Sequence, residues 1–278
     1  MWSSHRSPAS DDRGVALRHD YGWNTDQPGS VIVRAATGED LGLTLDLTDG
    51  SPSGDRVTAL MMLCVSDSRR APITETEIDA LVLGDRNMIL AELARITFGN
   101  EVDLQQRCSR PECGSELEWP AHFSEVLART DSTTAREDEL TIADHQVKLR
   151  PATVGDERRI RISADPVRTL VELCVDPSDG VSLDDDDVMK QIEAILEDLD
   201  PLASIEFTFA CYACDQPQRS ALDLPGLVLD LMRADDMRRF DDHHLLASGY
   251  GWSPADLLAL RPADRVRFAA NLVDLWEG

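Results

Sequence analysis

Two pairs of closely spaced cysteines are the residues of this sequence best suited to bind a metal ion. Cys108 and Cys113 form the first pair, and Cys211 and Cys214 form the second. Two thiolates presented by one tight turn can occupy adjacent vertices of a tetrahedron around zinc, at sulfur to metal distances near ~2.3 Å. Two such turns supply all four ligands of the zinc ion. The sequence therefore predicts one structural Zn²⁺ held by all four cysteines, which would clip the two halves of the chain together.

The residue after each pair suits a tight turn. Gly114 follows the first pair and allows the backbone to turn sharply away from a metal, and Asp215 at the equivalent place can tolerate a left-handed conformation. Structural zinc contributes roughly 10 to 16 kcal/mol of apparent binding free energy in small domains. A metal bound here would therefore rival the folding stability of an ordinary domain.

Other interpretations of the cysteines stay open. Cys211 and Cys214 alone could form the redox pair of a thiol oxidoreductase, although Cys211 does not open a helix after a buried strand. Four free cysteines are a second alternative. A catalytic zinc needs an open fourth position, which four cysteines close. Cys64 and Cys174 each fall on an apolar helical stripe, which is typical of core packing.

The motifs of common enzyme classes are absent from the sequence. It has no phosphate-binding loop, no dinucleotide fingerprint, no nucleophile elbow and no His-Glu metal helix. Among the six histidines only His243 and His244 are adjacent, and neighbouring positions on a helix do not face the same way. We therefore predict that the protein is not an enzyme.

Strand patterns flank both cysteine pairs. Residues 101–107 alternate in the manner of an extended segment, and 115–119 can pair back on them. Residues 204–209 alternate again directly before the second pair, and 219–224 can return as their partner. The sequence therefore predicts two β-hairpins, each carrying one zinc knuckle at its turn.

Helical patterns lie between the N-terminus and the first knuckle. Apolar residues fall at helical spacing over 57–65, and a second helix is expected after Thr74, which can cap it with Glu77 three residues on. A third helix should run from Asp85 to a stop before Gly99.

The first 45 residues carry weaker signals. Residues 1–30 are rich in Ser, Asp, Arg, Gly and Pro, which predicts a disordered tail. Residues 30–34 and 41–45 have the composition of short strands.

An acidic stretch separates the two knuckles. Within 131–200 we expect a hairpin of 140–142 with 147–149 and a helix capped by Thr153. The run of four aspartates at 184–187 lacks the ligand spacing, Gly and Glu of a calcium loop. It is predicted instead to begin a helix that ends at Leu199, because carboxylates favour a helix N-terminus.

The C-terminal part is predicted to be helical, and the whole chain to have an α+β fold. Helices are expected from Pro225, over 243–250, after Ser253 and over 262–276. The predicted domains are a tail at 1–30, an α+β zinc-binding domain at 31–225 and a helical module at 226–278. Within the zinc-binding domain, 55–130 and 201–225 carry the knuckles and 131–200 is an acidic insertion.

Composition limits the partners and the location. The 52 acidic and 27 basic residues give a formal net charge of -25, which would repel a nucleic acid backbone. The sequence contains no apolar run of about 18 residues, the length that a bilayer crossing needs. Residues 1–6 do not begin a standard secretion signal. We therefore predict a cytoplasmic protein with no nucleic acid partner and no membrane insertion.

Several segments of the chain resemble one family. These proteins are the T-even-type baseplate hub assembly chaperones, or baseplate proteins, of phage-tail-like contractile injection systems. The similar segments are 60–64, 73–78, 84–87, 96–99, 108–114, 207–211 and 224–225, and 250–260 resembles a small helical module common in the same gene clusters. The resemblance covers 55–130 best, whereas the first 50 residues and 131–200 match no pattern of the family.

The resemblance implies a non-enzymatic structural or assembly protein, with hub, tube or spike proteins of the same particle as partners. Of its functional positions, it carries over only the four cysteines as zinc ligands. The alternatives are a zinc-ribbon regulatory or protein-binding adaptor and, less favoured, a thiol oxidoreductase. A C-terminal stripe is one candidate docking face, although ordinary core packing is the favoured interpretation of it. The stripe consists of Leu257, Leu258, Leu260, Phe268, Leu272 and Trp276.

Overall fold

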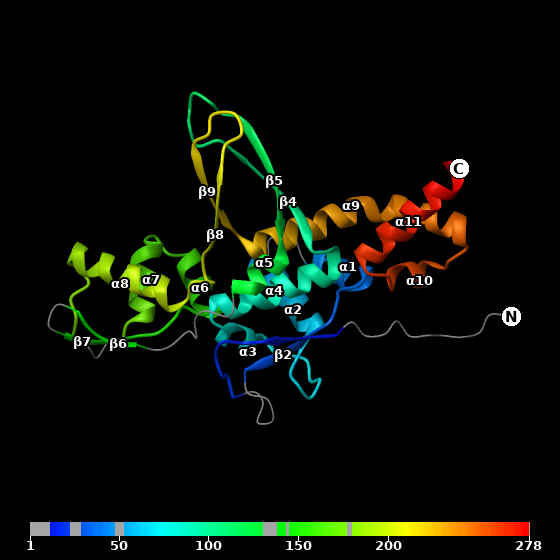
Figure 1. The fold of residues 1–278 in the computed structure, drawn as a ribbon. Coiled ribbons are helices and arrows are strands. Elements are labelled where there is room, and N and C mark those ends of the chain that lie inside the picture. Colours follow the sequence, from blue (N-terminus) through cyan, green and yellow to red (C-terminus); the bar gives the residue numbers. More distant parts are fainter. Residues whose placement is uncertain are drawn as a thin grey trace.

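The computed structural model has an α+β fold, in which a helical body carries a projecting arm of two β-hairpins (Figure 1). It describes residues 12–22, 29–47, 53–129, 138–142, 145–176 and 180–277. The described helices are α1 (Gly38–Leu45), α2 (Ser53–Cys64), α3 (Glu75–Ala80), α4 (Leu83–Phe98), α5 (Phe123–Ala128), α6 (Val154–Arg161), α7 (Pro166–Cys174), α8 (Asp186–Leu199), α9 (Leu224–Tyr250), α10 (Pro254–Leu258) and α11 (Pro262–Glu277). The described strands are β1 (Arg13–Ala16), β2 (Ser30–Val33), β3 (Val65–Ser66), β4 (Glu101–Arg107), β5 (Glu116–His122), β6 (Asp138–Ile142), β7 (His145–Leu149), β8 (Ile205–Ala210) and β9 (Pro217–Leu222).

Helix α4 lies at the centre of the main hydrophobic core, which also includes residues of α2, α5 and α9. Most of its residues are buried, because α5, α9, α11 and the first sheet all pack around it. It ends at Gly99, whose φ of 118° is readily adopted by glycine alone. The helices predicted over 57–65, after Thr74 and from Asp85 are confirmed as α2, α3 and α4.

The segment predicted as a disordered tail contains an ordered strand. β1 pairs antiparallel with β2, and β2 pairs with β3 to complete a small sheet. Val15 on β1 is buried in the main core, so the tail prediction is wrong for this segment. Residues 1–11 and 23–28 of the predicted tail lie outside the described residues.

The prediction of a strand over 41–45 is wrong, because these residues belong to α1. Thr37 and Asp40 form a reciprocal capping box at its N-terminus, in which each side chain accepts a hydrogen bond from the other residue's backbone N–H. Leu41 is fully buried while Leu43 is 56% exposed. The alternating leucines therefore lie on different faces of a helix.

The acidic insertion folds around a second core. β6 pairs with β7, and α6, α7 and α8 complete this α6–α8 lobe, which lies beside the main body (Figure 1). The hairpin, the Thr153-capped helix and the helix that follows the aspartate run are confirmed. Asp185 caps α8 by accepting a hydrogen bond from the N–H of Asp187. Residues 131–137 of the insertion lie outside the described residues.

The C-terminal region differs from the prediction of separate helices from Pro225 and over 243–250. α9 runs without a break through both, and it ends at Gly251 in the left-handed conformation. The predicted domain boundary at 225/226 therefore falls in the first turn of α9. The predicted helices after Ser253 and over 262–276 are confirmed as α10 and α11.

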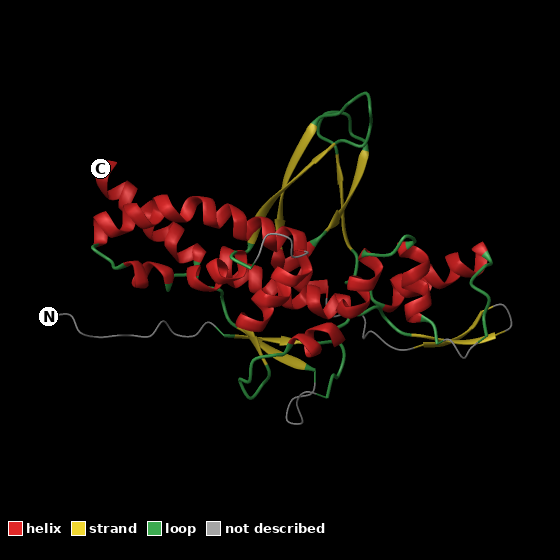
Figure 2. Ribbon diagram, turned by 180° about the vertical axis from the view of Figure 1, so that it is seen from behind, coloured by secondary structure: helices red, strands yellow, loops and turns green. Residues whose placement is uncertain are grey.

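The arm consists of the hairpins β4–β5 and β8–β9, which rise from the body and meet at their tips (Figure 2). Both hairpins predicted around the cysteines are confirmed. No helix in the described parts of the chain combines the length and the apolar character that a membrane crossing requires.

Candidate metal centre

The first knuckle is the turn that joins β4 to β5. The backbone N–H of Cys108 donates to the carbonyl of Ser115 at 2.9 Å, which extends the strand ladder into the turn. Gly114 has a φ of 54° and donates its N–H to the carbonyl of Arg110 at 3.1 Å. The turn therefore uses glycine where the backbone is left-handed, as the sequence predicts.

The second knuckle joins β8 to β9 in the same manner. The N–H of Cys211 donates to the carbonyl of Gln216 at 2.9 Å. Asp215 has a φ of 55° and donates its N–H to the carbonyl of Cys211 at 2.8 Å. The expected left-handed aspartate is therefore present, at the position that Gly114 occupies in the first knuckle.

The two knuckles bring together the four predicted ligands, Cys108, Cys113, Cys211 and Cys214. Their Sγ atoms all lie within 4.8 Å of one another. The Sγ atoms of Cys108 and Cys214 are 3.7 Å apart, and those of Cys113 and Cys211 are 3.9 Å apart. Four sulfurs at ~2.3 Å from a tetrahedral zinc are about 3.8 Å apart. The cysteines are free, and their spacing fits a shared metal ion rather than disulfides, whose sulfurs lie about 2.05 Å apart.

Neighbouring side chains support the knuckles. Trp119 of β5 stacks on Phe209 of β8 with ring centroids 4.1 Å apart, which packs one hairpin against the other below the sulfurs. Gln218 is buried and accepts a hydrogen bond from the N–H of Ser109 at 2.8 Å. The Tyr212 hydroxyl donates to the carbonyl of Glu116 at 2.7 Å, and so connects the second knuckle to the first hairpin.

Local hydrogen bonds and burial shift the pKa values of Cys113 and Cys108 in opposite directions. Hydrogen bonds from the hydroxyl and the backbone of Ser115 lower the pKa of Cys113 to about 6. At Cys108, the N–H of Arg110 favours the thiolate, but desolvation and the neighbouring thiols outweigh it and raise the pKa to about 12. Four adjacent thiols cannot all ionise easily without a cation, so the donor set fits a divalent metal.

Cys64 and Cys174 take no part in this centre. Both are buried, Cys64 in the main core and Cys174 in the α6–α8 lobe, as the sequence predicts. Desolvation raises the pKa of each thiol to about 12. They are inert core residues rather than ligands.

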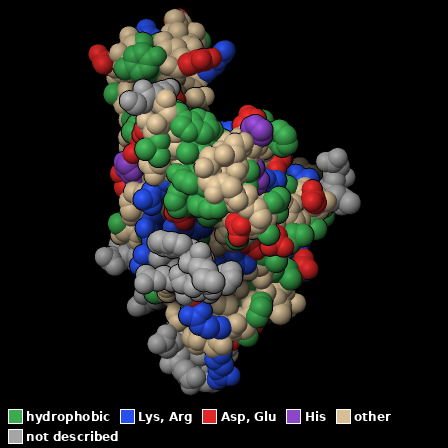
Figure 3. Space-filling view, turned by 90° about the vertical axis from the view of Figure 1, so that its right-hand side faces the viewer, with side chains coloured by type: hydrophobic (Ala, Val, Ile, Leu, Met, Phe, Trp, Pro, Cys, Tyr) green, Lys and Arg blue, Asp and Glu red, His purple; other side chains and the backbone are tan. Residues whose placement is uncertain are grey.

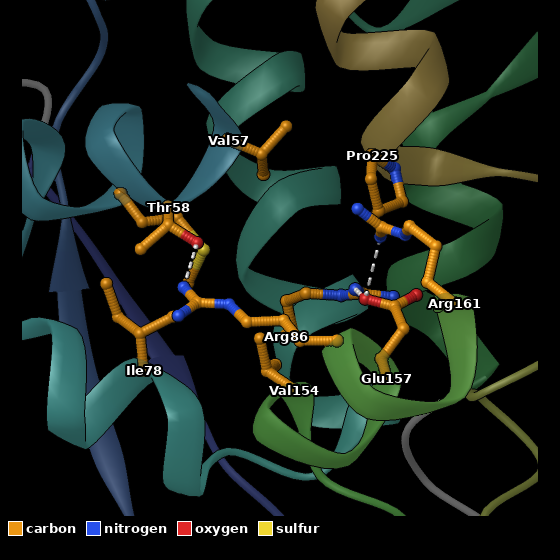
Figure 4. A pocket seen from close by; sticks show the side chains of 10 residues that line it. Val57, Thr58, Ile78, Arg86, Val154, Glu157, Arg161 and Pro225 are labelled. Atoms are coloured by element: carbon orange, nitrogen blue, oxygen red, sulfur yellow. Dashed lines mark hydrogen bonds and ion pairs between the residues drawn. The ribbon is translucent and has the colours of Figure 1, made fainter. Parts of the chain in front are cut away.

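A pocket between α2, α3 and α6 offers no comparable site (Figure 4). Arg86 and Arg161 both lie beside Glu157, with N–O distances of 2.6 Å and 3.5 Å. The cavity holds about 10 Å³, which is barely the space of one water molecule. The arginines are therefore matched by carboxylates in a packed region, and no ligand fits between them.

Sequence reasoning missed the supporting residues of the metal centre. Gln218 and the Trp119–Phe209 contact act across hairpins, and no local pattern marks them, whereas Ser115 acts within its own knuckle. The position of Ser115 two residues after Cys113 was the one available signal, because a hydroxyl there can reach the sulfur.

The α+β fold and the cysteine cluster define a protein with a candidate four-cysteine metal site of the zinc type. Among the described residues, this is the one group of His, Cys, Asp or Glu side chains close enough to hold a metal ion. Comparisons with protein-family models, with curated protein sequences and with solved structures each find no match to this chain.

Proposed function

We propose that the protein is a non-enzymatic, zinc-stabilised binding protein that builds, or forms part of, the baseplate or hub of a contractile phage-tail-like particle. The observation that carries the non-enzymatic role is the closed set of four sulfurs at the tip of the arm. Four thiolates leave zinc no open position for water or substrate, so the metal would hold the two hairpins together rather than react.

The burial of Cys211 supports the same role against thiol oxidoreductase chemistry. A redox nucleophile must be exposed and must have a lowered pKa. Cys211 is 0% exposed. The N–H of Gln216 favours the thiolate of its partner Cys214, but desolvation and the thiols of Cys211 and Cys113 outweigh it and raise the pKa of Cys214. The pair Cys211 and Cys214 therefore lacks the properties of an attacking thiol.

The assignment to a contractile particle rests on the resemblance of 55–130 and 207–225 to baseplate hub assembly proteins, and of 250–260 to a small helical module common in the same gene clusters. The proposed partners are hub, tube or spike proteins of the same particle. The net charge of -25 supports protein partners over nucleic acid, because the acidic surface repels phosphate.

A groove between α1, α9 and α10 is the surface best suited to dock such a partner. Its volume is about 420 Å³, and Leu43, Phe240 and Leu258 provide exposed apolar contacts within it. Glu39 and Asp46 are acidic residues of α1 and its C-terminal cap that also line it. An apolar floor beside acidic groups suits an amphipathic segment with basic residues.

The predicted C-terminal stripe divides between core and surface. Leu257 and Leu272 are buried, so the core interpretation is correct for them. Leu258, Phe268 and Trp276 are exposed, by 36%, 36% and 61%. Hydrophobic side chains gather on the end of the molecule that faces the viewer in Figure 3, where the C-terminal helices lie. These residues extend the candidate docking surface beyond the groove.

A pull-down with matched variants tests the proposal. The tagged full chain is expressed together with the genes of the surrounding cluster, and the recovered proteins are identified by mass spectrometry. Wild type should recover a hub, tube or spike protein. Leu43→Glu/Phe240→Glu, which changes two groove residues exposed by 56% and 80%, should lose at least about tenfold of that signal, and Ile162→Glu on α6 should keep it.

Four outcomes would each contradict a part of the proposal. Recovery of no particle protein by wild type would remove the assembly role, and recovery of transcription proteins instead would favour the regulatory adaptor. Equal recovery with the Leu43→Glu/Phe240→Glu variant would exclude the groove as the docking surface. Elemental analysis of the same samples should find about one zinc per chain, and a value near zero would remove the structural role of the metal.

A further inference from the structure

The two halves of the chain repeat one order of elements. The first half runs from the β1–β2 hairpin through α1, α2 and α4 to the β4–β5 hairpin and α5. The second half runs from the β6–β7 hairpin through α6, α7 and α8 to the β8–β9 hairpin and the start of α9. Each half therefore contains a hairpin, two short helices, a long helix, a cysteine hairpin and a closing helix.

The same seven-residue motif joins the first hairpin to its helix in both halves. It is Arg-x-Ala-Thr-x-x-Asp, at 34–40 and at 150–156. The Arg34 guanidinium donates to Asp40 at 2.7 and 2.9 Å and to the next carbonyl at 3.1 Å. Arg150 makes the same contacts, to Asp156 at 2.6 and 3.2 Å and to the next carbonyl at 3.0 Å. In each motif the threonine and the aspartate form a reciprocal capping box.

Capping boxes alone do not explain this agreement. Thr74 and Ser253 also begin capping boxes among the described helices. Neither is preceded by an arginine three residues earlier, which Thr37 and Thr153 both have. The arginine contacts are therefore specific to the two equivalent positions.

The second helix of each half ends in a similar sequence, Leu-x-x-Leu-Cys-Val, and in the same contact. Leu60 to Val65 reads Leu-Met-Met-Leu-Cys-Val, and Leu170 to Val175 reads Leu-Val-Glu-Leu-Cys-Val. The carbonyl of Cys64 accepts a hydrogen bond from the N–H of Arg34 at 2.9 Å. The carbonyl of Cys174 accepts one from the N–H of Arg150 at 3.0 Å.

The strand pairs around these contacts also correspond. Val65 pairs with Val33, and Val175 bridges to Leu149. All four residues are buried. The backbone connection from the first hairpin to the end of the second helix is thus the same in both halves.

The two knuckles complete the correspondence. Cys108 and Cys211 are the buried first cysteines, and Cys113 and Cys214 are the partly buried second ones. Each second cysteine is followed by a left-handed residue. Phe123 and Leu224 begin the closing helices, each at the same distance along the chain from the second cysteine of its knuckle, and both are buried.

The sulfur contacts have the symmetry that two equivalent knuckles require. Exchanging the halves replaces Cys108 by Cys211 and Cys214 by Cys113. The exchange therefore converts the 3.7 Å contact of Cys108 with Cys214 into the 3.9 Å contact of Cys211 with Cys113. The metal centre thus lies where an approximate two-fold axis between the halves would pass.

We infer that the chain contains two copies of one α+β unit, 13–128 and 138 to the first turns of α9, and that the four-cysteine centre is the joint between them on an approximate two-fold axis. The metal then binds as it would between the subunits of a dimer, with two thiolates from each copy. The copies differ in their additions. The first has α3 and a longer connection between α1 and α2, and the second extends its closing helix into α9.

Exchanging the two knuckles in the full chain tests this inference. Residues 109–112 are replaced by Tyr-Ala, and residues 212–213 by Ser-Arg-Pro-Glu. Equivalent knuckles predict that the exchanged chain keeps one zinc and melts within about 4 °C of wild type. The same chain with Cys108→Ser is the control that must lose the metal. Loss of zinc by the exchanged chain, with wild-type helicity by circular dichroism, would overturn the inference.

An experimental structure of zinc-loaded wild type provides a test that does not depend on a variant folding. The rotation that superposes the first copy on the second should be close to a half-turn. It should place Arg34 on Arg150, Cys64 on Cys174 and the cysteines of one knuckle on those of the other. A rotation far from a half-turn, or matched residues out of register, would overturn the inference. The result is independent of which partner the protein binds.

Discussion

At the scale of single residues, we predict that the four clustered thiols depend on a bound cation. They lie within 4.8 Å of one another, and hydrogen bonds with Ser115 lower the pKa of Cys113 to about 6. A bound metal would deprotonate all four and convert repulsion among thiolates into shared coordination. We therefore predict that the metal binds only when all four cysteines are present.

Replacing one ligand should remove the metal. Cys108→Ser and Cys214→Ser leave three thiolates, and we expect zinc content to fall from about one per chain to below about 0.1. Cys174→Ser makes the same chemical change in the α6–α8 lobe and should keep the zinc. Elemental mass spectrometry of the purified proteins measures both. A ligand variant that keeps wild-type zinc would show that its sulfur does not bind the metal.

The Arg34–Asp40 and Arg150–Asp156 ion pairs should make the stability of the fold depend on acidic pH in the same way. Burial acts to raise the pKa of Asp40, but hydrogen bonds from Arg34 and Thr37 hold it below the usual value of about 3.9, and Asp156 behaves alike with Arg150 and Thr153. A lowered pKa stabilises the fold above about pH 4, and this stabilisation is lost as the pH falls through the folded pKa.

Asp40→Asn and Asp156→Asn should therefore each cost about 1–2 kcal/mol of unfolding free energy at pH 7, because the arginines are partly exposed. The difference from wild type should stay constant down to about pH 5 and shrink below about pH 4. Urea unfolding across this range measures it, with Asp198→Asn on α8 as the exposed control. A loss of unfolding free energy in one of these aspartate variants without the other would contradict the equivalence of the two ion pairs.

At the scale of elements, local sequence signals predicted those helices and hairpins whose contacts are local. The Thr74 and Thr153 capping boxes and the alternation of β4 and β8 act within a few residues, and each was found. The error at α1 arose because the alternating leucines indicated a strand and the Thr37–Asp40 capping box was not recognised. The Arg-x-Ala-Thr-x-x-Asp repeat was likewise present in the sequence but was not recognised.

Long-range contacts explain why β1 was not predicted. The segment after β1 is tied to the start of α4, where Asp85 is fully buried and accepts hydrogen bonds from the N–H of Arg18 at 2.9 Å and the Tyr21 hydroxyl at 2.7 Å. A polar composition typical of disorder is therefore ordered by a buried carboxylate about 65 residues away along the chain. Nothing near β1 in the sequence indicates that partner.

The junction of α9 and α11 depends on one buried arginine. Arg265 is 0% exposed and pairs with Asp235, which is 1% exposed, and with Asp242 at 2.9 Å. Arg265→Ala leaves the buried carboxylate of Asp235 unpaired, so we expect a loss of about 3–5 kcal/mol of unfolding free energy.

Arg267→Ala is the matched control for this junction, because that arginine is 79% exposed in its side chain and should cost less than about 0.5 kcal/mol. Chemical denaturation of both variants gives the comparison. If Arg265→Ala were as stable as Arg267→Ala, the ion pair would not hold α11 against α9.

At the scale of the whole molecule, the tip of the arm has its own small hydrophobic cluster, whereas the other end of its hairpins packs on the main core through Ile205, Val102, Phe207 and Leu222. The main core is large and centres on α4, and the α6–α8 lobe has its own core, which meets the main one at Leu83. The arm's hydrophobic cluster has only Cys108, Leu117 and Cys211 as fully buried members. Two-stranded hairpins are marginally stable by themselves, so the metal should supply most of the stability of the arm.

Removing the metal should therefore open the arm while the body stays folded. After chelation, backbone amides of β4, β5, β8 and β9 should exchange with deuterium at least about tenfold faster, which corresponds to about 1.4 kcal/mol of lost local stability. Amides of α4 should keep their protection, because its core includes no ligand cysteine. Added zinc should restore the arm, whereas magnesium, which prefers oxygen ligands, should not. Equal loss of protection in α4 would show that the centre stabilises the whole fold, and unchanged exchange in the arm would show that the four sulfurs hold the hairpins together without a metal.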